Sequence, residues 1–117
     1  MSTVQFLDEC IRLGTQAKGR VATAQINNLL VVLNSIRDPE EAIRTTILWI
    51  ARQMGRGDID RHFGRDLIKL LHKVLKSEEE PQKRLDLARK ILGWVKWAFE
   101  SPARGVCRGL DALVQHV

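Results

Sequence analysis

Apolar residues recur at intervals of three and four along almost the whole chain, which is the spacing of one buried face of an α-helix. No segment alternates apolar and polar residues as a strand does, and no internal repeat is present. Glycine, proline and polar clusters interrupt the pattern between the periodic segments. Because such short connections favour antiparallel neighbours, the pattern predicts an all-α fold, a compact bundle of five to six mostly antiparallel helices.

The first two helices are expected at residues 3–17 and from Thr23 onward. Gly14 weakens the first helix, so residues 1–20 are predicted to be the segment most prone to fraying. Thr23 is a favourable N-cap for the second helix. The first helix has an apolar face made of Phe6, Cys10, Leu13 and Ala17, and the second has a stripe made of Ile26, Leu29, Leu30, Leu33 and Ile36.

The third helix has the clearest start, because a capping Asp38, a Pro39 at the first helical position and two following acids agree with one another. Gly55 and Gly57 close it. The fourth helix is expected from about Asp58 or Asp60 to Lys76. The inward residues are Ile43, Ile47, Ile50 and Met54 on the third helix and Leu67, Ile68, Leu71, Val74 and Leu75 on the fourth.

The fifth helix carries an apolar stripe and stops at Ser101-Pro102. Its start has two readings: Ser77 and Glu80 as a capping box, or Pro81 in the first turn. A short last helix is expected from Ala103 or Leu110 to Gln115. The whole chain, residues 1–117, is predicted to be one domain, with a core bundle over 22–100 and a short C-terminal helix within 101–117. The stripe of the fifth helix consists of Leu85, Ala88, Ile91, Leu92, Val95, Ala98 and Phe99.

The composition of the chain indicates a soluble protein of the cytoplasm. No apolar run approaches the ~18 residues that cross a bilayer, and the first ten residues lack the features of a signal peptide. The two cysteines, Cys10 and Cys107, are far apart in sequence and lack zinc-ligand spacing, so they are read as buried or idle thiols. Spacing alone does not decide whether they form a disulfide.

Candidate catalytic or metal-ligating residues are few. Asp58, Asp60 and His62, with Asp66 one turn further, have the alternation of a loop ligand set, but helix starts also attract Asp for electrostatic reasons. His72 and His116 are read as surface residues. No serine or cysteine stands at a recognisable spacing from a base. We therefore expect no enzymatic activity, no metal and no cofactor.

Basic residues are concentrated in the fourth helix. The net charge is +5, and residues 55–76 hold six basic and three acidic side chains. Arg61, Arg65, Lys69 and Lys73 recur every four residues and so form one ridge. Arg52 and Arg56 precede this ridge, which could follow the phosphates of one nucleic-acid strand. The alternative is an ordinary solvated face.

The three tryptophans differ in position. Trp94 lies beside the apolar stripe of the fifth helix and is expected in the core. Trp49 and Trp97 lie off the stripes of their helices. Each is either half-buried under a neighbouring element or a contact for a partner.

Several segments resemble a known family. Residues 23–30 (TAQINNLL) are similar to the T-S-Q-I-R-x-L-L helix of the small subunit of type III CRISPR interference complexes, the Csm type. Residues 47–52 (ILWIAR) resemble that family's apolar helix, which ends in alanine-arginine after an aromatic. Residues 85–99 match its closing amphipathic helix. The chain has Asn27 where the family has Arg, and Trp49 where it has Tyr.

The resemblance implies a helical bundle without catalytic activity, in an antiviral ribonucleoprotein. Copies of such a subunit stack along the guide RNA–target RNA duplex beside the large and backbone subunits. They contact RNA mainly through its phosphates, and the guide supplies the specificity. The expected RNA-binding residues of this chain are Arg52, Arg56, Arg61, Arg65, Lys69 and Lys73.

Two other functions remain open from the sequence. The third and fourth helices, joined through residues 54–57, are compatible with a helix-turn-helix that binds duplex DNA. The charge is also compatible with a pure protein–protein interaction module. The subtype of complex, the copy number, the RNA strand contacted and the oligomeric state of the free chain do not follow from the sequence.

Overall fold

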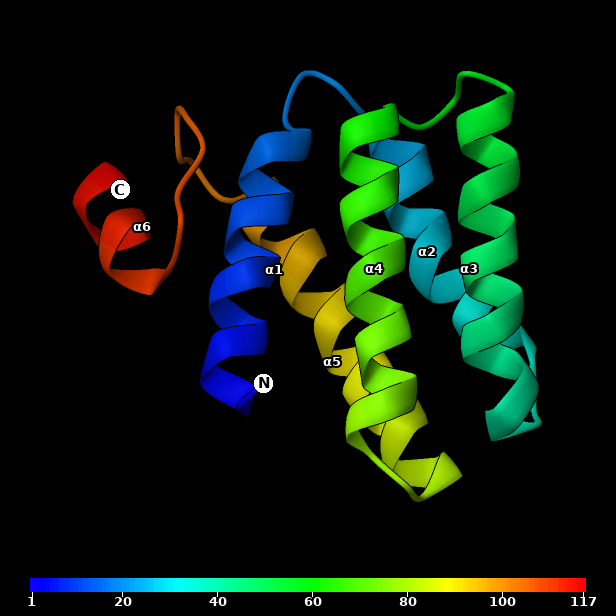
Figure 1. The fold of residues 1–117 in the computed structure, drawn as a ribbon. Helices are drawn as coiled ribbons and strands as arrows, with labels where there is room; N and C mark the ends of the chain where they lie inside the picture. Colours follow the sequence, from blue (N-terminus) through cyan, green and yellow to red (C-terminus); the bar gives the residue numbers. More distant parts are fainter.

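The computed structural model describes all residues, 1–117, and contains six α-helices and no strand (Figure 1). This confirms the all-α prediction. None of the helices combines the length and the apolar character needed to cross a bilayer. The helices are α1 (Thr3–Ala17), α2 (Thr23–Ser35), α3 (Pro39–Gly55), α4 (Arg61–Ser77), α5 (Pro81–Glu100) and α6 (Leu110–His116).

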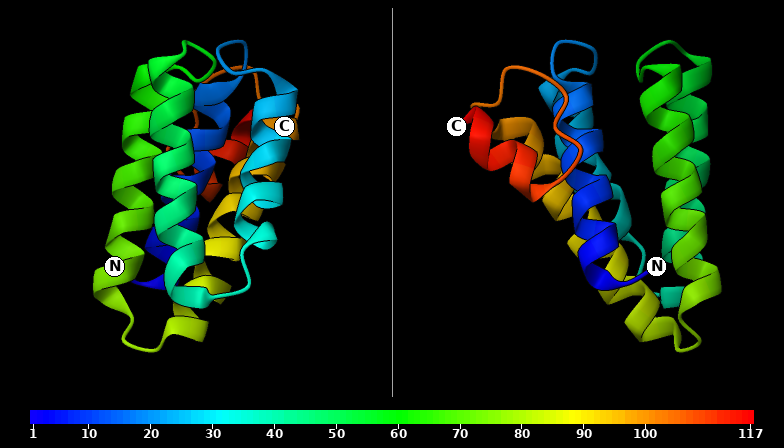
Figure 2. Two further views of the ribbon diagram at one scale, coloured as in Figure 1. Left: turned by 90° about the vertical axis from the view of Figure 1, so that its right-hand side faces the viewer. Right: turned by 60° about the vertical axis from the view of Figure 1, so that its left-hand side comes forward.

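The first five helices run alternately up and down, as the short connections predicted (Figure 1). Helix α1 packs mainly against α5, although these two helices stand at opposite ends of the bundle's sequence. Helix α3 packs against α2, α4 and α5, and the short α6 contacts α1 alone. The radius of gyration is 13.4 Å, close to the roughly 13 Å of a compact chain of this size. Figure 2 shows α6 beside α1, on the far side of the molecule from α3 and α4.

One apolar core joins the five long helices. Helix α1 is an integral part of this core rather than a loosely held end, because its four stripe residues are at most 2% exposed. Ser2 and Gln5 also form a capping box at its start, which the sequence analysis missed. The core includes Phe6, Cys10, Leu13 and Ala17 of α1 and Phe63, Leu67, Leu70, Leu71 and Val74 of α4.

The starts of the helices follow the predicted signals with two corrections. Helix α3 begins at Pro39 with Asp38 as N-cap residue, as expected, although the Asp38 side chain makes no capping hydrogen bond. The N-cap of α2 is Ala22, so Thr23 is the first residue inside the helix. The capping box of Ser77 and Glu80 is wrong, since Ser77 ends α4 and α5 begins at Pro81. A proline fits this first position because its missing N–H would have no partner there.

The chain beyond α5 crosses back over α1 before it becomes helical again. Residues 102–109 contain no helix, so the last helix begins at Leu110 and not at Ala103. A second, small apolar cluster forms beneath this segment from Ile11, Ala103 and Cys107. The backbone N–H of Cys107 donates to Thr15 Oγ1 at 2.9 Å, which ties the segment to α1.

Candidate nucleic-acid interface

Helix α4 presents the predicted row of basic side chains to solvent. Its apolar residues face the core, and the opposite side carries Arg61, Arg65, Lys69 and Lys73, all of them exposed. We call these four residues the basic ridge. At about 1.5 Å of rise per residue, the ridge extends over roughly 18 Å. The helix begins at Arg61 because Asp60 Oδ2 accepts a hydrogen bond from the backbone N–H of Phe63 at 3.1 Å.

The members of the basic ridge differ in how their charges are compensated. Arg65 lies near two side chains of its own helix, with its Nε 3.7 Å from Asp66 Oδ1 and its Nη2 3.4 Å from His62 Nδ1. Arg61, Lys69 and Lys73 make no side-chain hydrogen bond and no ion pair within the molecule. Three of the four cationic groups are therefore available to an external anion.

The two lysines of the ridge line a charged groove between α1 and α4. Its volume is about 110 Å³, and its wall also carries two acids and an arginine. The two acids do not belong to the ridge itself, because Asp66 is displaced around α4 and Glu9 comes from α1. We call this the α1–α4 groove. It is lined by Glu9, Arg12, Asp66, Lys69, Leu70 and Lys73.

Arg12 holds both acids of the α1–α4 groove. Its guanidinium donates to Glu9 Oε1, with Nε at 3.1 Å, and its Nη2 lies 3.4 Å from Asp66 Oδ2 on α4. Its Nη1 donates to Gln16 Oε1 at 3.2 Å. The hydrogen bond to Glu9 is the main cause that raises the pKa of Arg12, and partial burial opposes it. Arg12 was not among the predicted site residues, because its contact with Asp66 joins positions 54 residues apart.

Arg52 and Arg56 lie at the end of α3, just before the start of the ridge. Arg52 is in the last turn of α3 and is exposed. Arg56 is also exposed, but its Nε lies 3.3 Å from Asp58 Oδ2. Arg56 is thus partly compensated by a neighbour in the turn, whereas no acid pairs with Arg52.

The predicted metal-ligand candidates do not converge on one point. Asp58 faces Arg56, Asp60 caps α4, and Asp66 is held by Arg12 and Arg65. No group of three His, Cys, Asp or Glu side chains lies close enough to hold a metal ion. His72 and His116 are exposed, as expected. Each carboxylate of the turn therefore has a structural partner of its own.

The tryptophans occupy three different environments. Trp94, expected in the core, packs against it but keeps part of its surface exposed. Trp49 is half-buried against the same core. Of the two expectations for this residue, this is burial under a neighbouring element. Trp97 is 70% exposed. It borders an apolar groove of about 180 Å³ formed by Leu7, Ile11, Trp94, Trp97, Ala98, Leu110 and Leu113.

The two cysteines are buried thiols and do not form a disulfide. Burial is the main cause that raises the pKa of the Cys10 thiol, with a smaller contribution from the charge of Glu9. A neutral, buried thiol is a poor nucleophile. Neither residue therefore has the environment of a reactive cysteine.

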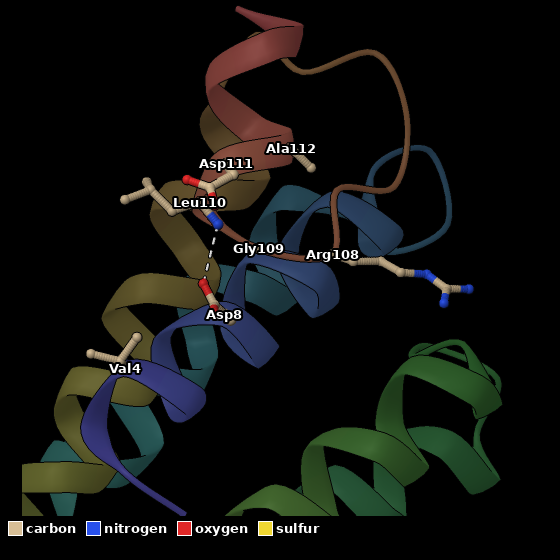
Figure 3. A pocket seen from close by; sticks show the side chains of 7 residues that line it. All are labelled: Val4, Asp8, Arg108, Gly109, Leu110, Asp111 and Ala112. Carbon is tan, nitrogen blue, oxygen red and sulfur yellow. Dashed lines mark hydrogen bonds between the residues drawn. The ribbon is translucent and has the colours of Figure 1, made fainter.

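The largest hollow, about 420 Å³, lies between α1 and the start of α6 and was not foreseen (Figure 3). Asp8 Oδ1 accepts a hydrogen bond from the backbone N–H of Leu110 at 3.1 Å, so α1 supplies the cap for α6. A Cβ at Gly109 would lie 3.0 Å from the same oxygen, and φ there is +156°. This contact fastens α6 to α1. The side chain of Arg108 extends away from Asp8 in Figure 3.

Comparison of the chain with protein-family models, with curated proteins and with solved structures found no match in any of the three.

Proposed function

We propose that the chain is a non-catalytic RNA-binding small subunit of a type III CRISPR effector ribonucleoprotein. Its ridge of basic side chains would contact the phosphates of the guide RNA–target RNA backbone. The single observation that carries the proposal is the exposure of Arg61, Lys69 and Lys73 on one face of α4 without an internal partner. The net charge of +5 and the resemblance of residues 23–30, 47–52 and 85–99 to that family support it.

Unpaired surface cations are well suited to a polyanion. Each lysine or arginine that neutralises a phosphate releases a condensed counterion, and this release supplies much of the affinity. The ridge carries long, flexible side chains and lacks the Asn and Gln that read base edges. It is therefore suited to contacts that position the protein and not to contacts that read a sequence.

A DNA-binding regulator is less well supported. In a helix-turn-helix the two helices cross at about 90–120°. Here α3 and α4 lie side by side and antiparallel in both Figure 1 and Figure 2. Such a pair does not set α4 apart as a recognition helix that can enter the major groove.

The proposal includes partners and a location. The partners would be the guide and target RNA, other copies of this chain, and the large and backbone subunits of the complex, in the cytoplasm. Arg52 and Arg56 lie at the end of α3, just before α4 begins, and would add phosphate contacts at the N-terminal end of the ridge. Arg56 would contribute less than Arg52, because Asp58 competes for it.

The test compares classes of nucleic acid on the purified full-length chain. Fluorescence anisotropy should give equal affinities for two single-stranded RNAs of unrelated sequence, and weaker binding to duplex DNA. A preference for one duplex DNA sequence would favour the regulator. Absence of binding to any nucleic acid, even at low salt, would favour the interaction module. In the assembled complex, an RNA of defined length should copurify with the chain.

A further inference from the structure

The α1–α4 groove places two acids directly beside two lysines of the basic ridge. Glu9 and Asp66 share this groove with Lys69 and Lys73. Unoccupied carboxylates so close to two ammonium groups would attract them into ion pairs. Yet neither lysine forms an ion pair, because both acids are bound to Arg12 instead.

Arg12 is well placed to hold Glu9 and Asp66 and poorly placed for a direct contact with RNA. Its side chain is only 24% exposed, and all three of its nitrogens already donate to Glu9, Gln16 or Asp66. A guanidinium in this position has little capacity left for a phosphate. Its planar fork can instead engage acids from two helices at once, which a lysine does less well.

From this geometry we infer that Arg12 is a positioning residue for RNA binding. By holding Glu9 and Asp66, it keeps Lys69 and Lys73 available to a backbone phosphate seated at the mouth of the α1–α4 groove. The inference rests on the proposed function, which needs the ridge to bind RNA. Beyond the proposed function, the inference assigns a phosphate subsite at the groove and a role to Arg12, a residue outside α4. It also explains why two acids are tolerated beside a phosphate contact.

The consequence of losing Arg12 follows from the charges of the groove. In Arg12→Gln, Glu9 has no cationic partner and Asp66 keeps only Arg65, whose Nε lies 3.7 Å from its Oδ1, so Lys69 and Lys73 turn toward the two acids. Both lysines are then lost as phosphate contacts although neither has been mutated. At about 0.7 per contact for a single strand, the slope of log affinity against log salt should fall by up to about 1.4.

The decisive experiment is a rescue by removal of the acids. Anisotropy titrations with an oligouridine at several salt concentrations should show that Arg12→Gln binds weakly and with the reduced slope. The triple variant Glu9→Gln/Arg12→Gln/Asp66→Asn should recover the parent's slope, since nothing then competes for the lysines. Arg89→Gln is the matched control: Arg89 also holds an acid, Asp86, at 3.4 Å, but lies on α5. It should leave the slope unchanged.

A fourth variant separates this role from simple fastening of α1 to α4. Glu9→Gln/Asp66→Asn keeps Arg12 but removes both of its ion pairs, and it should keep at least the parent's salt slope, because Lys69 and Lys73 have no acid to turn toward. If Arg12 acted only by fastening α1 to α4, that variant would show the same reduced slope as Arg12→Gln. Circular dichroism and urea unfolding show that each variant is folded.

Three outcomes would overturn the inference. If Arg12→Gln binds like the parent, the acids do not compete for the lysines. If the triple variant stays as weak as Arg12→Gln, Arg12 contacts phosphate itself. If Lys69→Ala/Lys73→Ala also binds like the parent, the ridge is not the RNA-binding surface, and the proposed function fails together with the inference.

Discussion

Gly14 of α1 lies directly against the backbone of α5 at Val95. A Cβ built at Gly14 would be 2.6 Å from Ala98 Cβ and 2.9 Å from the backbone nitrogen of Phe99, and it would also meet the Val95 carbonyl oxygen. The glycine therefore lets α1 and α5 approach each other closely.

Gly14→Ala should destabilise the protein despite the better helix propensity of alanine. Propensity favours alanine by about 1 kcal/mol, but overpacking against a helix backbone costs typically 1–3 kcal/mol. Urea unfolding should therefore show a lower midpoint. The control is Gly93→Ala on α5, where a Cβ would meet no atom within 4 Å, and where stability should rise. A Gly14→Ala variant more stable than the parent would contradict the packing described here.

Thr15→Val should loosen the segment that leads to α6. It removes the acceptor of the buried Cys107 N–H, and an unsatisfied buried donor costs about 1–3 kcal/mol. Thr46→Val is the matched control, because the buried Thr46 hydroxyl only donates to the Ala42 carbonyl and accepts from no backbone group. Urea unfolding should give the larger loss for Thr15→Val, and hydrogen exchange at the Cys107 amide should accelerate. Equal losses in the two variants would show that the contact is dispensable.

Alkaline pH should destabilise the fold partly through Cys10. Burial raises the pKa of this thiol in the folded state, so above the ordinary cysteine pKa of about 8.5 the unfolded chain loses a proton that the folded chain keeps. Stability is thus fully present below that pH and falls above it, by at most about 2 kcal/mol at pH 10. Unfolding free energies measured from pH 7 to pH 10 should fall less steeply for Cys10→Ala. Identical slopes for parent and variant would contradict the assigned cause.

The sequence was sufficient to predict the local features of the fold. Helix periods, the start at Asp38-Pro39 and the exposed ridge depend on residues within one or two turns of each other. Gly14 was judged a weak point because its helix propensity was visible, whereas its contact with α5 joins distant segments. The same holds for the link between Arg12 and Asp66, which places acids next to the ridge. Contacts of this kind depend on how the helices pack, which periodicity does not encode.

The salt dependence of RNA binding shows whether the basic ridge contacts phosphates. Replacing Arg61, Arg65, Lys69 and Lys73 together by alanine should reduce the slope of log affinity against log salt by up to about 2.8, at about 0.7 per contact, equally for every RNA sequence. The helical spectrum should persist, since these side chains are exposed.

The control replaces four exposed basic residues outside the ridge and changes the net charge by the same amount. It is the variant Lys83→Ala/Arg89→Ala/Lys90→Ala/Arg104→Ala. We expect a large loss of slope for the ridge variant and little loss for this control. Equal losses in the two variants, or an unchanged slope for the ridge variant, would contradict phosphate contacts by the basic ridge.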